Sequence, residues 1–282
     1  MSSQLRRAEL RARFERLARR PAEHVDAVEG ALLIAAEADP SLAPEDALAR
    51  LDELARDAAA RIGAVEDPQA RVAALCRFVR EAGFRGNRED YYDLRNSFLP
   101  EVLARRTGIP ISLALVQLAI ARHLGWPIYG VSFPGHFLLK YVDPGGGAEI
   151  LIDPFDACVL SEDDCRERAK TALGPEARFG PHLLRIATGR DILVRVLGNL
   201  KQIYVQRGEL EEALACCDRI LLLDPGAAGE LRDRGLLYHQ LECFEAARRD
   251  LERYLEARPG DPAADALRDT LVEIRSQAER LH

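Results

Sequence analysis

Residues 91–155 of this 282-residue chain read YYDLRNSFLPEVLARRTGIPISLALVQLAIARHLGWPIYGVSFPGHFLLKYVDPGGGAEILIDPF. Ser112 stands near the start of a long apolar run, His136 follows a Pro-Gly pair, and Asp153 ends a second apolar run. The pattern predicts a helix followed by two strands, with one polar side chain at each of these three places. A hydroxyl, an imidazole and a carboxylate are the side chains of a nucleophile, a base and an orienting acid.

The two predicted strands form a hairpin because the run Asp143–Gly147, DPGGG, is a turn signal between them. If the turn is centred after its second residue, residue numbers that face each other add to 289. This register sets His136 opposite Asp153 and Lys140 opposite Glu149, and apolar residues face each other between these pairs. A slip by one residue would put the imidazole and the carboxylate on opposite faces of the sheet. The sequence therefore predicts a histidine–aspartate pair at one end of a hairpin, where the histidine opens its strand.

The run Ile111–Leu124 is apolar on nearly every face, which predicts a buried central helix that begins after Pro110. Ser112 then lies in the first turn, where the helix dipole favours a developing anion. Two interpretations stay open for this serine. One is a helix cap, the usual role of a serine at a helix start. The other is a nucleophile for which His136 is the general base.

Four segments of the chain resemble the bacterial SirB-type family, whose members join a transglutaminase-like core to tetratricopeptide repeats. The segments are GFRGN at 83–87, RNSFLPEVLARRTGIPISLA at 95–114, PGHFLL at 134–139 and IDPF at 152–155. The resemblance extends from about residue 31 to the C-terminus. It implies a papain/transglutaminase-like core with a small antiparallel sheet.

The resemblance also implies roles for individual residues. In transglutaminases a cysteine at the start of a helix is followed by histidine and aspartate on successive strands, and His136 and Asp153 match the second and third of these. Ser112, or Ile111 if the alignment shifts by one residue, stands where the cysteine is expected. Asn96 precedes the helix that carries this position, and we expect it to donate to an oxyanion or to cap the helix that follows.

The last third of the chain contains an internal repeat. The segment at 196–225 aligns with the segment at 230–259 at an offset of 34 residues, so that Tyr204 matches Tyr238 and Ala213 matches Ala247. This period and these residues are typical of the tetratricopeptide repeat, a pair of helices. The remaining residues show helical periodicity and predict a third helix that starts another repeat or caps the stack. The repeats predict a protein or peptide partner.

Apolar residues recur at three- and four-residue spacing before residue 88, which predicts helices throughout that segment. The fold class is therefore α+β. We predict a helical N-terminal layer at 1–88, the transglutaminase-like core at 89–185, and the all-α repeats at 190–282.

Composition narrows the possible partners and cofactors. The net charge is −7 and no basic stripe interrupts the chain, which argues against a nucleic-acid partner. The chain contains no run of about 18 apolar residues, the length that would predict a membrane span. No apolar segment of a signal peptide follows the N-terminus, so we predict a cytoplasmic protein. The six cysteines show no metal-binding spacing, and we expect reduced structural thiols, no metal and no cofactor. Cys158 follows Asp153 closely and is an alternative, displaced nucleophile in a loop.

Two classes of function follow from these residues. In the first, the protein is a catalytically silent or altered interaction or regulatory protein, because the expected cysteine is replaced by serine. In the second, Ser112, His136 and Asp153 form an acyl-transfer hydrolase, peptidase-like, that acts on an amide or ester. The replaced cysteine favours the first class, and the retained histidine and aspartate favour the second.

Overall fold

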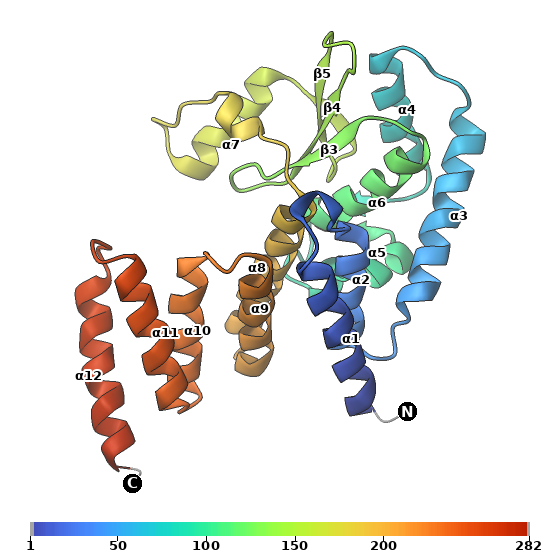
Figure 1. Ribbon diagram of the computed structural model, residues 1–282. Coiled ribbons are helices and arrows are strands. Elements are labelled where there is room, and N and C mark those ends of the chain that lie inside the picture. The colour runs from blue at the N-terminus through green and yellow to red at the C-terminus, as the bar shows by residue number, and fades with distance from the viewer. Residues whose placement is uncertain (1–2, 281–282) are drawn as a thin grey trace. The chain divides into compact units, whose positions relative to one another are not determined.

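The computed structural model describes residues 3–280 (Figure 1). These residues divide into two compact units, with the division after Val196. The α+β prediction is confirmed, with a predominantly helical chain and two small sheets. The predicted three-part division stays a prediction. The helices are α1 (Ser3–Ala18), α2 (Ala27–Ala38), α3 (Pro44–Ile62), α4 (Pro68–Glu81), α5 (Leu99–Arg105), α6 (Pro110–His123), α7 (Glu162–Leu173), α8 (Gly189–Arg207), α9 (Leu210–Leu223), α10 (Ala228–Gln240), α11 (Phe244–Ala257) and α12 (Ala264–Arg280).

Four antiparallel strands form the main sheet of the first unit in the order β3-β4-β5-β6. Their bounds are β3 (Ile128–Val131), β4 (Leu138–Val142), β5 (Glu149–Asp153) and β6 (Cys158–Leu160). The first and last of these strands had no sequence prediction. A second, parallel pair joins β1 (Arg85–Gly86) to β2 (Thr107–Gly108). The prediction that residues 1–88 are helical throughout is therefore wrong at β1, because two extended residues are too short for a period to reveal them.

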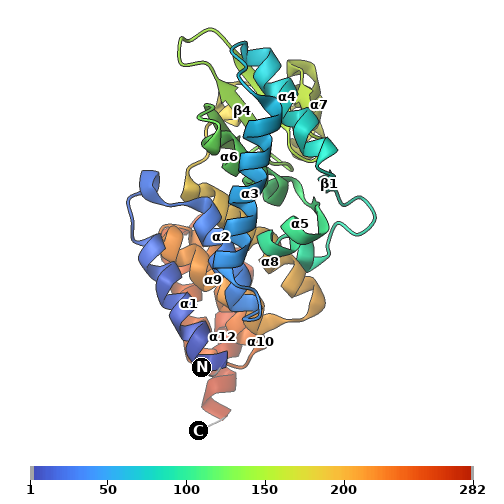
Figure 2. The ribbon, with the colours of Figure 1, turned by 90° about the vertical axis from the view of Figure 1, so that its right-hand side faces the viewer.

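Helix α6 is the predicted central helix, and its first two turns are buried on every side. Pro110 occupies its first turn as expected. The helix lies between the main sheet and α3 (Figures 1 and 2). Helix α7 packs on the sheet through Cys165 and Ala169, which share a core cluster with Leu138 of β4. The two sides of this small sheet are thus both covered within the first unit.

The hairpin of β4 and β5 has a different register from the predicted one. Leu139 faces Ile152 and Lys140 faces Leu151, so facing numbers add to 291 rather than 289. The loop is longer than predicted because Asp143 organises it: its backbone carbonyl accepts from Gly146 at 2.9 Å and its side chain accepts from Gly147 at 3.2 Å. A shift of two residues leaves every side chain on its predicted face.

The second unit contains the predicted helix pairs. Helices α9 and α11 begin and end 34 residues apart. The backbone carbonyls of Tyr204 and Tyr238, also 34 apart, accept equivalent bonds from Glu209 and Cys243. Ala213 and Ala247 are both fully buried, as close approach of the paired helices requires. The prediction of a 34-residue helical repeat is confirmed.

The turn inside each helix pair needs a left-handed residue, which is Gly208 at φ 73° in the first repeat and Glu242 at φ 58° in the second. A side chain in this conformation costs about 1 kcal/mol, whereas glycine adopts it without strain. We therefore expect Glu242→Gly to stabilise the second unit by about 0.5–1 kcal/mol and Gly208→Glu to destabilise it by a similar amount. Urea unfolding followed by circular dichroism measures both, and effects of the same sign in the two variants would contradict the argument.

Candidate functional site

His136 and Asp153 meet in the structure, where the His136 Nε2 lies 2.9 Å from the Asp153 Oδ1. The prediction that His136 opens its strand is wrong, because β4 begins at Leu138 and His136 lies in the turn before it. The predicted direct cross-strand pairing is also wrong, since the register of β4 and β5 sets Leu139 opposite Ile152 and includes no pair with His136. His136 instead reaches Asp153 from the turn that leads into β4, near the end of the hairpin.

Asp153 is fully buried and every one of its carboxylate contacts stabilises the anion. Its Oδ1 also accepts from the Phe155 backbone N–H at 2.8 Å, and its Oδ2 accepts from the Arg168 Nη2 at 2.7 Å. Burial opposes ionisation, but the bonds and charges of His136, Phe155 and Arg168 outweigh it, and the pKa of Asp153 lies below its usual range. Arg168 comes from α7 and had no sequence prediction, because it is one charge among many on that helix.

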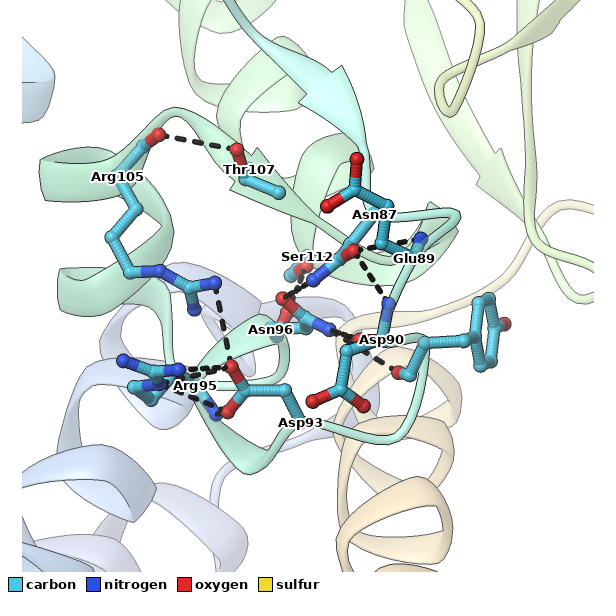
Figure 3. A network of polar contacts seen from close by, with 10 residues as sticks. Asn87, Glu89, Asp90, Asp93, Arg95, Asn96, Arg105, Thr107 and Ser112 are labelled. Atoms are coloured by element: carbon cyan, nitrogen blue, oxygen red, sulfur yellow. Dashed lines mark hydrogen bonds and ion pairs between the residues drawn. The ribbon is translucent and has the colours of Figure 1, made fainter.

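Ser112 bonds to other groups than His136 and Asp153, and Figure 3 shows it beside Asn96. Its side chain is fully buried, its Oγ lies 2.6 Å from the backbone carbonyl of Asn96, and it accepts from the Ile109 N–H at 3.1 Å. These bonds use the hydroxyl as donor and as acceptor, and both partners are backbone atoms. Ile109 is the N-cap of α6, so Ser112 is the third residue of the helix and not its cap. The interpretation of Ser112 as the helix cap is therefore wrong. Its hydroxyl instead accepts from the backbone N–H of Ile109, as the third helical residue does in a capping box.

Asn96 ties a surface loop to the start of α6 (Figure 3). Its fully buried side chain donates to the carbonyls of Asp90 at 2.7 Å and Tyr91 at 3.2 Å, and it accepts from the Asn87 Nδ2 at 3.1 Å. The N-cap of α5 is Phe98 and not Asn96, so the predicted cap role is wrong. Its amide donors are both engaged by the loop carbonyls. The oxyanion role stays a prediction.

Cys158 is the first residue of β6 and lies directly opposite Asp153, so the prediction that it lies in a loop is wrong. Burial raises the pKa of this thiol, and the nearby carboxylates of Asp153 and Asp156 raise it further. A thiol held in its protonated form is a poor nucleophile. None of the six cysteines, all of which the structure describes, forms a disulfide, and the described residues include no group of three or more metal-binding side chains.

Comparisons with known proteins agree with this architecture. Residues 45–198 match the transglutaminase-like superfamily, and residues 200–271 match the tetratricopeptide repeat. The chain is 42% identical over 218 residues to a UPF0162 protein of Xylella fastidiosa, across 75% of this chain and 76% of that one. It is 36% identical over 245 residues to a UPF0162 protein of Vibrio cholerae, across 86% and 90% of the two chains. No solved structure matches the chain.

A transglutaminase-like core joined to tetratricopeptide repeats is therefore the class of protein that the fold defines. Protein SirB1 of Salmonella typhimurium is 30% identical over 237 residues, across 84% of this chain and 87% of that protein. The chain belongs to the bacterial UPF0162 family, and the resemblance to SirB-type proteins is confirmed. No helix among residues 3–280 is long and apolar enough to cross a membrane.

Proposed function

We propose that this protein is a catalytically silent transglutaminase-like protein that acts by binding a protein or peptide through its repeats. The bonding of Ser112 is the observation that carries the proposal. A nucleophilic serine needs a base within hydrogen-bond reach of its Oγ, and the bonds of this Oγ go to the backbone of Ile109 and Asn96. The tetratricopeptide repeats supply the binding module.

In a catalytically silent protein, His136 and Asp153 have a structural role. Together with Arg168 they join the hairpin, the turn before it and α7 through two short contacts to one carboxylate. A buried carboxylate whose oxygens are all bonded stabilises this junction. The same contacts orient an imidazole, which supports the second candidate, a serine-dependent hydrolase. That candidate requires Ser112 to leave its backbone partners and reach His136.

Thiol labelling distinguishes the two candidates. We expect the thiol introduced by Ser112→Cys to react with iodoacetamide far more slowly than the exposed Cys243, because residue 112 is fully buried and the reagent cannot reach it in the folded chain. Cys243 is an internal standard in the same molecule, and mass spectrometry after proteolysis reads both sites. Adding His136→Ala should leave the rate at position 112 unchanged.

A fluorophosphonate probe tests the wild-type chain directly. We expect the probe not to label Ser112, so the wild type and Ser112→Ala should be labelled to the same extent. The reason is that a hydroxyl bonded to two backbone groups is not activated. Binding of the repeat partner should likewise survive both Ser112→Ala and His136→Ala, in variants whose fold is checked by circular dichroism. Probe labelling that disappears in Ser112→Ala, or an introduced thiol that reacts faster than Cys243 only when His136 is present, would establish the hydrolase instead.

A further inference from the structure

A groove of about 800 Å³ lies in the first unit, between the two short parallel strands and the loop that follows β5. Its walls include four arginines, two acidic side chains and the rings of Phe84 and Phe155. The charged lining residues are Arg80, Arg85, Arg88, Glu89, Arg105 and Asp156. The cations outnumber the anions on this surface, although the whole chain carries a net charge of −7. A local positive field of this kind attracts anions.

The groove is made by the GFRGN segment, which neither the fold of the repeats nor the His136–Asp153 pair explains. Arg85 and Gly86 form β1, which pairs with Thr107 and Gly108 of β2, and Arg85 is exposed. Phe155 lies against the Gly86 backbone so closely that a methyl group there would meet the ring at 2.3 Å. The groove wall is therefore fixed by close packing and not by mobile side chains.

Acidic side chains of the protein itself neutralise only some of the groove's arginines. Arg88 pairs with Asp156 and lies over the Phe155 ring, with its guanidinium carbon 5.0 Å from the ring centroid. Arg80 donates to the Ala157 carbonyl, which is uncharged. Arg85 makes no side-chain hydrogen bond or ion pair with the residues that the structure describes. Two of these three guanidinium groups, those of Arg80 and Arg85, thus form no ion pair with a carboxylate of the described residues.

Arg105 adds a second, independent observation. Its Nη2 lies 3.4 Å from the Asp93 Oδ2 (Figure 3), whereas its Nη1 is buried and has no hydrogen-bond partner in the described part of the chain. This nitrogen has almost no accessible surface, so a ligand in the groove would meet the exposed quarter of the Arg105 side chain, whose charge adds to the positive field of the wall. Guanidinium groups present paired N–H donors that match the oxygens of phosphates and carboxylates.

We propose that this groove binds a small ligand that carries a phosphate or carboxylate group. Arg85 binds the oxyanion, the charge of Arg105 strengthens the positive field around it, and Phe155 provides an apolar wall for the rest of the ligand. The volume lies in the range of small-molecule sites. The site belongs to the first unit alone, and it is independent of the partner that the repeats bind.

Calorimetric titration of the full-length protein tests this inference, with inorganic pyrophosphate and citrate as separate probes at constant ionic strength. We expect saturable binding of at least one probe with a Kd of about 1 mM or tighter. Arg85→Ala should weaken that binding about ten- to hundredfold, the usual effect of a lost charged hydrogen bond. Tighter binding of pyrophosphate would assign a phosphate ligand, and tighter binding of citrate a carboxylate ligand.

Arg77→Ala is the matched control, because Arg77 is an exposed arginine of α4 that does not line the groove. This substitution should change the affinity less than about twofold, because it removes one positive charge outside the groove and salt screens its effect on the ligand. Asp156→Asn should tighten binding, since it removes an anion from the groove. Trp126 fluorescence confirms that each variant folds. Three results would overturn the proposal: no saturable heat with either probe, equal weakening by Arg77→Ala and Arg85→Ala, or no tightening by Asp156→Asn.

Discussion

Asp153→Asn should lower the free energy of unfolding of the first unit by about 3 kcal/mol. The substitution keeps the size of the side chain but removes the charge that His136 and Arg168 contact at 2.9 and 2.7 Å. Asp153 is fully buried, so its contacts are little screened by water, whereas Arg168 is about one-third exposed, and we therefore place the loss at the lower end of the usual range.

Urea unfolding followed by Trp126 fluorescence measures this loss, because Trp126 is the single tryptophan of the chain and belongs to the first unit. Asp163→Asn is the matched control, since the Asp163 side chain is 88% exposed and pairs with Arg166 at the surface of the same helix that carries Arg168. It should cost no more than about 0.5 kcal/mol. Equal losses in the two variants would show that the buried carboxylate contributes nothing particular.

The effect of Asp153 should depend on pH. The pKa of this carboxyl is lower in the folded chain than its ordinary value of about 4, so ionisation stabilises the folded state. The stabilisation is complete above the unfolded pKa and is lost as pH falls through the folded pKa. The stability difference between wild type and Asp153→Asn should therefore shrink below about pH 4. A difference that persists undiminished below about pH 3 would contradict this account.

The sequence predicted the repeats well because their signal is local. A 34-residue period repeats the same helix lengths and the same buried alanines, and these are set by residues within one helix pair. The central helix was predictable for the same reason, since an apolar run this long has to be buried. The two-residue strands β1 and β2 were not predictable, because they form only when segments more than 20 residues apart meet.

The candidate site was predictable only in part. The sequence correctly brought His136 and Asp153 together, although the Asp143 turn moved the register by two residues and His136 reaches the carboxylate from the turn before β4. The partners of Ser112 were not predictable, because the hydroxyl is 2.6 Å from a carbonyl 16 residues away in the sequence. No local pattern marks Arg168 among the charges of α7. Side chains that meet through tertiary contacts need the fold before their partners are known.

Arg234→Met should have the largest effect in the second unit. Arg234 joins three helices: its Nε and Nη2 contact the two oxygens of Asp250 at 2.6 and 2.9 Å, and its Nη1 contacts Asp218 at 2.8 Å. The Asp250 residue is only 2% exposed, so the substitution leaves a buried carboxylate without its guanidinium. We expect a loss of about 3–5 kcal/mol in unfolding free energy, measured by circular dichroism in urea.

Two further variants separate the buried charge from the packing of the side chain. Arg249→Met, next to Asp250 but exposed, is the control and should change stability by less than about 0.5 kcal/mol. Arg234→Met combined with Asp250→Leu should recover most of the loss, because replacing both members of a buried pair leaves no uncompensated charge. If the double variant were as unstable as Arg234→Met alone, the loss would come from packing around the arginine, and the buried carboxylate would not be its cause.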